Sequence, residues 1–305
     1  MFLAISNNKK FEQFCSIVKN TKELKGQVNF NFNSSGLYVQ AMDEAHVSVL
    51  ETSIHNSWFD NYNCTSESYI TIGLDVEVLG KVLATKQEPQ QLEMRYVDDS
   101  DEIDIMFTDI NSNADVSTSS VDNITVAISD LNVCDEPKQK KKRTKKTYEK
   151  HFVLKLYDIE QDLMSLPFDQ QDVEFTMLFG DFSTTIDQLM MFSDVVNVDI
   201  NELAVSLIAE NENMGTMSIK INTDDLEEIS MDEQEAPTTS VLSNNYGLRY
   251  IKLFCNFNKI SDIVEVKISN EKPIGLFFNI EGDGSGTNDT FLRLFIAPKI
   301  TDNDD

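Results

Sequence analysis

One apolar pattern occurs twice in this sequence, and the repetition limits the possible folds more than any other feature. In each copy, two runs with apolar residues at alternate positions flank a short turn, which is the period of half-buried β-strands. The turns fall at Asn33–Gly36 and Asn201–Ala204. The apolar positions correspond one to one: Val28, Phe30, Phe32, Leu37, Val39 and Ala41, then Val196, Val198, Ile200, Val205, Leu207 and Ala209. Identical phasing across two hairpins indicates an internal duplication.

Helical patterns surround both hairpins in the same order. An apolar stripe with helical spacing precedes each hairpin, at residues 11–18 and 182–190, and Asp181 is the predicted N-cap of the second helix. A further helix follows each hairpin, one after Asp75 as N-cap and one over residues 248–255. A strand pair comes next in each copy: Gln91–Val97 with Glu102–Phe107, and Ile263–Ser269 with Gly275–Ile280. We predict an α+β protein of two duplicated domains, each an antiparallel sheet with two helices on one face.

One stretch does not belong to the duplication. Residues 111–147 begin with Asn, Ser, Thr and Asp and then become basic, and seven of the nine residues at 138–146 are Lys or Arg. Such a run repels itself, so we predict a solvated insertion with at most a short strand at Val121–Ile128. We place the first domain at 1–154, a connecting segment at 155–167, and the second domain at 168–305.

Charge and cysteine usage narrow the class of protein. The formal net charge is −27, which argues against a generic nucleic-acid binder, so any DNA contact needs a local basic surface. The four cysteines (Cys15, Cys64, Cys134 and Cys255) form no CxxC pair. We predict reduced intracellular thiols, with Cys15 and Cys255 in the core, and neither a zinc site nor disulfides. No apolar run approaches the ~20 residues of a membrane span, and no secretory signal is recognised.

The sequence has no motif of an enzyme. The three histidines (His46, His55 and His151) belong to no catalytic motif, and neither a Walker loop nor a nucleophile elbow occurs. The glycine cluster at 282–286 joins two strand-like segments and is predicted to be a hairpin loop. We therefore expect no catalytic activity, no cofactor and no bound metal.

Three segments resemble DNA sliding clamps of the proliferating cell nuclear antigen family. Ser34–Ser48 resembles the first-domain signature of that family, Lys155–Pro167 its interdomain connecting loop, and Leu294–Ile300 its C-terminal signature. Residues 72–75 and 247–250 fit as well, so the resemblance covers nearly the whole chain except about 111–147. The insertion and the divergence from the family raise the hypothesis of a viral lineage.

The resemblance implies a homotrimeric ring that encircles duplex DNA. In this family three subunits close head to tail, with helices inside and sheets outside, and the ring acts as a polymerase processivity factor. The expected partners are duplex DNA, a DNA polymerase, a clamp loader and repair proteins, in the nucleus or at a cytoplasmic viral replication site. Strands around 148–155 and 214–221 are both predicted edge strands. The resemblance implies that they pair between subunits through Tyr148, Phe152, Leu154, Met214, Met217 and Ile219.

The resemblance also implies a hydrophobic pocket beneath the connecting loop. Family partners insert a short helical turn that bears one aliphatic and two aromatic side chains. The matching positions are Met42, His46, Val47, Met164, Leu166, Pro167, Pro273, Phe295, Ala297, Pro298 and Lys299. The alternative interpretation is that these residues are ordinary core.

DNA contacts are expected on the inward faces of the helices. The candidates are Lys9, Lys10, Lys19, Lys81 and Arg249, followed by Lys22, Lys86 and Lys252. The predicted helix over 182–192 departs from the family because it has no basic residue, and Thr184, Asp187 and Met191 stand where basic groups or histidine are usual. The inner wall is therefore less positive than the family pattern. Within the insertion, the candidates are Lys140, Lys141, Lys142, Arg143, Lys145 and Lys146.

Two other functions stay open at this point. One is a monomeric or dimeric processivity factor that holds DNA by charge, which the basic insertion favours. The other is a clamp-like protein-interaction scaffold, which the acidity of the chain favours. The basic run at 138–146 has three interpretations: an electrostatic DNA tether, a nuclear-import signal, or a loop without a role.

Overall fold

The computed structural model describes residues 1–110, 148–166, 171–231, 242–280 and 290–299, and within them one order of elements occurs twice. The first copy contains β1 (Phe2–Ile5), α1 (Asn8–Thr21), β2 (Gln27–Asn33), β3 (Gly36–Met42), β4 (Ser48–His55), β5 (Asn61–Asn63), β6 (Ile70–Asp75), α2 (Val76–Leu83), β7 (Gln90–Arg95), β8 (Glu102–Asp109) and β9 (Lys150–Lys155). The second contains β10 (Val173–Leu178), α3 (Phe179–Leu189), β11 (Val195–Asn201), β12 (Ala204–Asn211), β13 (Gly215–Asn222), β14 (Glu228–Met231), β15 (Leu242–Gly247), α4 (Leu248–Cys255), β16 (Ile263–Ile268), β17 (Ile274–Asn279) and β18 (Phe291–Ile296). The α+β class and the duplication are confirmed.

The strands form three antiparallel sheets. Their orders are β5-β1-β7-β8-β9, β14-β10-β16-β17-β18-β4-β3-β2-β6 and β13-β12-β11-β15. The long central sheet joins the two copies where β18 pairs with β4, from Phe291 opposite Ser53 to Ile296 opposite Ser48. Each copy therefore divides its strands between two sheets. Apolar alternation shows which face of a strand is buried, but it does not show which strands pair.

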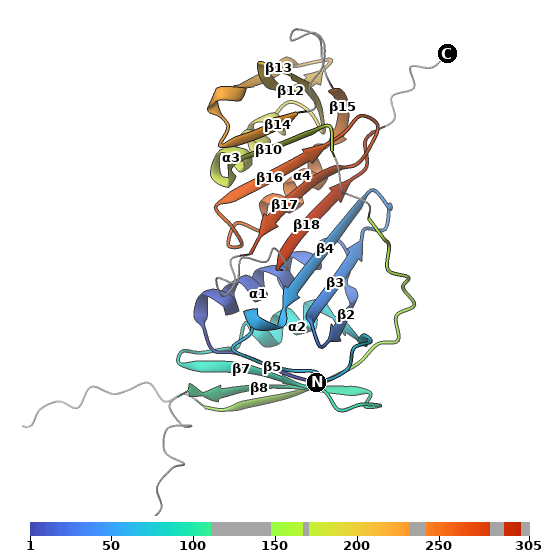
Figure 1. Ribbon diagram of the computed structural model, residues 1–305, viewed down its shortest axis with the longest axis vertical. Coiled ribbons are helices and arrows are strands. Elements are labelled where there is room, and N and C mark those ends of the chain that lie inside the picture. The colour runs from blue at the N-terminus through green and yellow to red at the C-terminus, as the bar shows by residue number, and fades with distance from the viewer. Residues whose placement is uncertain (111–147, 167–170, 232–241, 281–289, 300–305) are drawn as a thin grey trace, which may run out of the picture.

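The four helices of the described residues form one layer on one side of the central sheet (Figure 1). Helix α1 packs against α2, and α3 against α4. The two pairs meet between α1 and the end of α4. There the Gln13 side chain donates to the Ile260 carbonyl at 3.1 Å, and the Asn20 side chain donates to the Asn256 carbonyl at 2.9 Å. The layer order is thus α2, α1, α4, α3.

Helices α1 and α2 begin on a side-chain cap, whereas α3 and α4 do not. Asn7 accepts from the Lys9 and Lys10 amides, and Asp75 caps α2 as predicted. The predicted cap at Asp181 is wrong, because α3 begins at Phe179 and Asp181 lies in its first turn. The Phe179 amide instead donates to the Asp262 carbonyl at 2.8 Å. A carboxylate in the first turn still interacts favourably with the helix dipole.

The predicted apolar phases are confirmed, since every alternating position of the two hairpins is buried. Cys255 is also buried as predicted, but Cys15 is only partly buried. Burial raises the pKa of Cys15 to about 12 and that of Cys255 to about 11, so both thiols are poor nucleophiles. Cys134, the possible strand at 121–128 and the glycine cluster at 282–286 lie outside the described residues.

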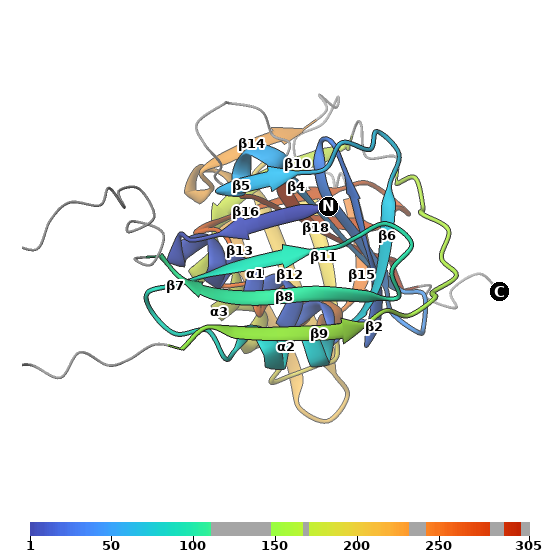
Figure 2. The same cartoon turned by 90° about the horizontal axis from the view of Figure 1, so that it is seen from below.

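The two predicted edge strands are edge strands. Strand β9 closes one sheet beside β8, and β13 closes another beside β12. They lie at opposite ends of the long axis of the molecule, with β13 at the top of Figure 1 and the β8–β9 end at the bottom. This lower end faces the viewer in Figure 2. Within the described ranges, no helix has the length and apolarity to cross a membrane. No cluster of His, Cys, Asp or Glu in these ranges is arranged to hold a metal ion.

Candidate functional site

The connecting segment crosses the outer face of the central sheet, the face opposite the helices. It passes over β6, β2 and β3 in turn and appears as the yellow-green strand-free stretch beside these strands in Figure 1. The Tyr157 amide donates to the Gly73 carbonyl of β6 at 2.9 Å. The Asn29 side chain of β2 donates to the Ile159 carbonyl at 2.9 Å.

Gly73 allows this close approach. A Cβ atom at this position would lie 2.1 Å from the Tyr157 carbonyl oxygen, far inside van der Waals contact. A side chain at residue 73 would therefore push the connecting segment off β6.

The segment reaches β3 at Gln40, whose side chain is almost completely buried. Gln40 Oε1 accepts from the Met164 amide at 2.8 Å, and its Nε2 donates to the Met164 carbonyl at 3.0 Å. The Gln161 side chain donates to the Gln40 carbonyl at 2.9 Å. These bonds place Met164 beside the β3 end that carries Met42.

The loop after β3 joins this region to the second copy. The Asp43 carboxylate accepts from the backbone amides of Val47 at 2.9 Å and Ser48 at 2.6 Å, which closes the loop. The Val47 carbonyl accepts from the Ala297 amide at 2.8 Å. Three distant parts of the sequence therefore meet around one stretch of the outer face: the loop after β3, the connecting segment and the chain after β18.

The predicted pocket residues that the structure describes come from these three parts, but they differ in accessibility. Met42, Val47, Leu166, Ala297 and Pro298 are partly buried, whereas His46, Met164, Pro273 and Lys299 are exposed. Phe295 is only 3% exposed and packs edge-on against Phe277 at 5.7 Å between ring centroids, so it is a covered residue beneath this surface. Pro167 lies outside the described residues.

Sequence reasoning missed the side chains that hold the connecting segment. Asn29 and Gln40 occupy outward positions in apolar-alternating strands, where a polar residue is normally solvated. Here both are buried beneath another segment. The alternation of apolar residues cannot reveal this burial, because the segment that covers Asn29 and Gln40 lies more than a hundred positions away in the sequence.

The helix layer carries a charge balance unlike that of the whole chain. It contains the basic residues Lys9, Lys10, Lys19, Lys81, Arg249 and Lys252 and the acidic residues Glu12, Glu77, Asp181 and Asp187. Several of these charges pair within the layer or beside it. Lys81 lies 2.7 Å from Glu77, Lys252 contacts Asp187, and Lys259 lies 3.0 Å from Glu12. This surface is close to neutral on a chain of net charge −27.

The candidate cations occupy different environments. Lys9, Lys19, Lys22, Lys81 and Arg249 are exposed. Lys22 and Arg249 also line a cavity of about 880 Å³ between the end of α1, the loop after β3 and the start of α4. Lys86 donates to Asn8 at 2.9 Å and lies 4.6 Å from the centre of the Phe11 ring. The basic residues at 140–146 lie outside the described residues.

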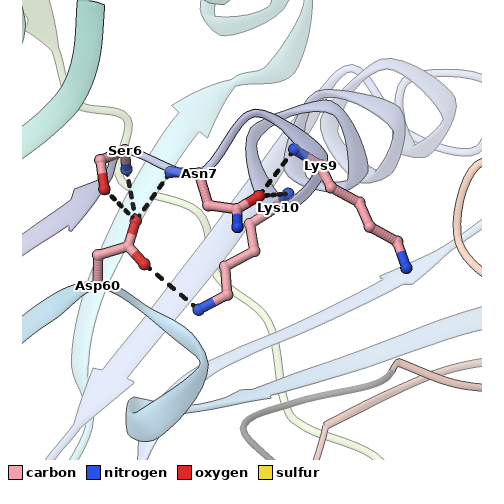
Figure 3. Close-up of polar contacts among 5 residues, drawn as sticks. All are labelled: Ser6, Asn7, Lys9, Lys10 and Asp60. Carbon is pink, nitrogen blue, oxygen red and sulfur yellow. Dashed lines mark hydrogen bonds and ion pairs between the residues drawn. The ribbon is translucent and has the colours of Figure 1, made fainter.

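Lys10 is directed to a structural carboxylate, as Figure 3 shows. Asp60 accepts from the Ser6 amide at 2.6 Å, the Ser6 hydroxyl at 2.7 Å and the Asn7 amide at 3.0 Å. Lys10 Nζ lies 3.4 Å from the other carboxylate oxygen and 5.7 Å from the centre of the Trp58 ring. Burial alone would raise the pKa of Asp60, but these hydrogen bonds and the charge of Lys10 outweigh it and hold the pKa below its usual value.

The predicted interface residues lie on or beside the two edge strands. Phe152 and Leu154 of β9 and Met217 and Ile219 of β13 are partly buried against the core. Tyr148 and Met214 are exposed and precede their strands.

Comparison with known proteins agrees with this architecture. The family models for the N-terminal and C-terminal domains of proliferating cell nuclear antigen match residues 9–136 and 166–299. The chain is 24% identical to the proliferating cell nuclear antigen of Chaetomium thermophilum, over 94% of this chain and 95% of that protein. It is also 24% identical to proliferating cell nuclear antigen 2 of Drosophila melanogaster (94% of both chains) and to the Saccharomyces cerevisiae protein (97% of this chain, 98% of that one). Because the two family models cover most of the chain in the order of its two copies, the chain belongs to the proliferating cell nuclear antigen family of sliding clamps.

Proposed function

We propose that three copies of this chain close head to tail into a ring around duplex DNA and tether a polymerase and other replication and repair proteins to it. The observation that supports closure is the pairing of β18 with β4 inside the chain. Their counterparts in the other copy are β9 and β13. Each of these has only one neighbour among the described strands, so each presents free backbone donors and acceptors.

The duplication predicts the register of the junction between subunits. Within the chain, Leu294 of β18 lies opposite Leu50 of β4. Leu294 lies opposite Leu276 of β17, and Phe152 lies opposite Ile105 of β8. Leu276 and Ile105 lie in turn opposite Val266 and Met94, which both come 11 residues after the end of the preceding helix, so Leu294 corresponds to Phe152. Leu50 corresponds to Met217, because they lie opposite Ala41 and Ala209, which are equivalent in the two hairpins.

Phe152 should therefore lie opposite Met217 of the next subunit, with both side chains on the core side. The same register places Val153 opposite Thr216 and the exposed Glu149 opposite the exposed Lys220. Apolar residues then meet on the buried face and opposite charges meet at one end of the junction, and both kinds of cross-strand pair are stabilising.

Cysteine cross-linking tests the ring and its register together. The double variant Val153→Cys/Thr216→Cys should give a covalent trimer under mild oxidation, because residues directly opposite in antiparallel strands have Cβ atoms ~4.5–5.5 Å apart. Val153→Cys/Ser218→Cys, which is displaced by two residues, should cross-link less, and each single variant should stay uncoupled like the wild type. A wild-type mass of one chain by light scattering at micromolar concentration would defeat the proposal.

In this assembly the helix layer faces the DNA. Its near-neutral charge supports weak, sequence-independent contact, so retention depends on closure of the ring and not on affinity. A closed ring should stay on circular DNA and slide off linear DNA with free ends. The alternative, a monomer or dimer held by the basic run at 138–146, should show equal retention on both.

We also propose that the outer surface around the loop after β3, the connecting segment and the chain after β18 binds the clamp-binding peptides of partner proteins. Its support is the meeting of these three parts and the exposed apolar side chains of Leu163 and Met164. Met164→Asp should abolish binding of such a peptide by placing a charge in the apolar contact. Leu203→Asp, at an exposed apolar residue in the turn between β11 and β12, is the matched control.

A further inference from the structure

The connecting segment is attached to the sheet by amide side chains, while its apolar side chains stay outside. Gln40 is 2% exposed and Asn29 is 5% exposed, and both bond the backbone of the segment. Leu163 and Met164, in contrast, are 42% and 44% exposed. Apolar burial therefore does not hold Met164 in place, and the hydrogen bonds set its position.

Gln40 is the strongest of these attachments because it uses both ends of its amide on one residue. Its two bonds to Met164 imitate the pair that a β-bridge makes. Gln161 makes a single bond to the Gln40 carbonyl, and its own Oε1 is buried without a partner. The segment is thus held tightly at Met164 and more weakly at Gln161.

A hydrogen-bond chain fixes the orientation of the Gln40 amide. Tyr38 donates its hydroxyl proton to the Glu51 carboxylate at 2.9 Å, so its oxygen is left to accept from Gln40 Nε2 at 3.1 Å. The Gln40 Oε1 atom then faces the Met164 amide, which can only donate. Every donor in this network meets an acceptor. The reversed amide would set its NH2 group against the Met164 amide, and its oxygen against the Met164 carbonyl and Tyr38 hydroxyl oxygens.

We propose that Gln40 is a positioning residue that latches the connecting segment at Met164, and so holds the exposed apolar side chains of the segment where a partner peptide meets them. This inference rests on the proposed peptide-binding surface for its functional part, whereas the latch itself is independent of it. Tyr38 acts through Gln40 by setting the polarity of its amide.

Gln40→Met tests the latch, because methionine has nearly the same length and volume and fits a buried site without making these bonds. Hydrogen exchange of residues 156–166 is the direct measure. Loss of two ordinary hydrogen bonds predicts roughly tenfold faster exchange at 161–166, with no change in β9 or the core. Gln161→Met removes one bond and should have a clearly smaller effect, and Tyr38→Phe should fall between the two.

Affinity for a clamp-binding peptide with one aliphatic and two aromatic anchors is the second measure. It should fall by about tenfold in Gln40→Met if the latch preorganises the contact surface. A cooperative urea transition and an unchanged assembly mass show that the variant is folded.

The outcomes separate the latch from the proposed function. Unchanged exchange at 161–166 in Gln40→Met overturns the latch, whatever the peptide does. Faster exchange with unchanged peptide affinity supports the attachment but overturns the positioning role. Faster exchange in a protein whose wild type binds no peptide supports the latch and refutes the proposed binding surface.

Discussion

Asp60 connects three pieces of the first copy that are separate in sequence: the end of β1, the start of α1 and the chain after β4. Asp60→Asn keeps the size of the side chain but replaces the carboxylate that accepts from Ser6 and Asn7 with a neutral amide. Because these donors lose a charged acceptor, we expect a loss of about 1–3 kcal/mol in the free energy of unfolding. Urea denaturation at pH 7 measures this loss, and an unchanged midpoint would contradict the assigned role.

The lowered pKa of Asp60 predicts how that loss depends on pH. A carboxyl with a depressed folded-state pKa contributes its full stability above the unfolded-state value of about 3.9. The contribution disappears as the pH falls through the lower folded-state pKa. The stability gap between wild type and Asp60→Asn should therefore be widest near neutrality and shrink below about pH 4.

Gly73 offers a residue-scale test with an internal control. Gly73→Ala places a methyl group 2.1 Å from the Tyr157 carbonyl oxygen, so the backbone must separate at this point. We expect a destabilisation of about 1–3 kcal/mol and faster hydrogen exchange at Tyr157. Gly80→Ala in α2 meets no atom within 4 Å and should raise stability by up to about 1 kcal/mol. Equal effects of the two variants would show that close approach at Gly73 has no importance.

At the scale of elements, periodicity predicted the repeated hairpins, helices and later strand pairs but not the strands β4, β6, β10 and β15 beside them. The hairpins β2–β3 and β11–β12, all four helices and the two later strand pairs were predicted within a few residues. Strands β1, β5 and β14 have three or four residues each, too few to display an alternation. The buried place of Phe295 was also missed, because Phe277 of the neighbouring strand β17 packs on it, and the alternation of its own strand does not show that contact.

Helix α3 contains no basic residue, and its charge can be altered. Thr184 and Gln188 are exposed on α3, so replacing both with Lys should add two phosphate contacts per subunit at most. Each contact makes the slope of log affinity against log salt steeper by roughly 0.9 on duplex DNA. Titrations at several salt concentrations measure this slope.

The matched control places the same charges on the opposite side of the molecule. Ser206→Lys and Ser243→Lys lie on outward positions of β12 and β15 and should leave the slope unchanged. The inward orientation of the helix layer would be contradicted if the salt slope became steeper in the control, or if it stayed unchanged in the α3 variant.

For the whole molecule, the basic run at 138–146 is the largest local excess of positive charge in the sequence. If it tethers DNA, deleting it should flatten the salt slope by several units, since each phosphate contributes roughly 0.9. Binding to linear DNA should weaken, while assembly and peptide binding should persist. If affinity and slope are both unchanged, the run is an import signal or has no role.

The duplication also has a mechanical consequence for the proposed ring. Six strand junctions of nearly the same register would close it, but the β18–β4 junctions are held by a covalent tether and the β9–β13 junctions are not. A short tether keeps its two strands at millimolar effective concentration, whereas separate chains meet only at their concentration in the cell. A local break at a tethered junction would reseal at once, and a break at an untethered one would persist. In the proposed ring, opening for DNA entry would therefore be confined to the three seams between chains, although both kinds of seam are built from equivalent strands.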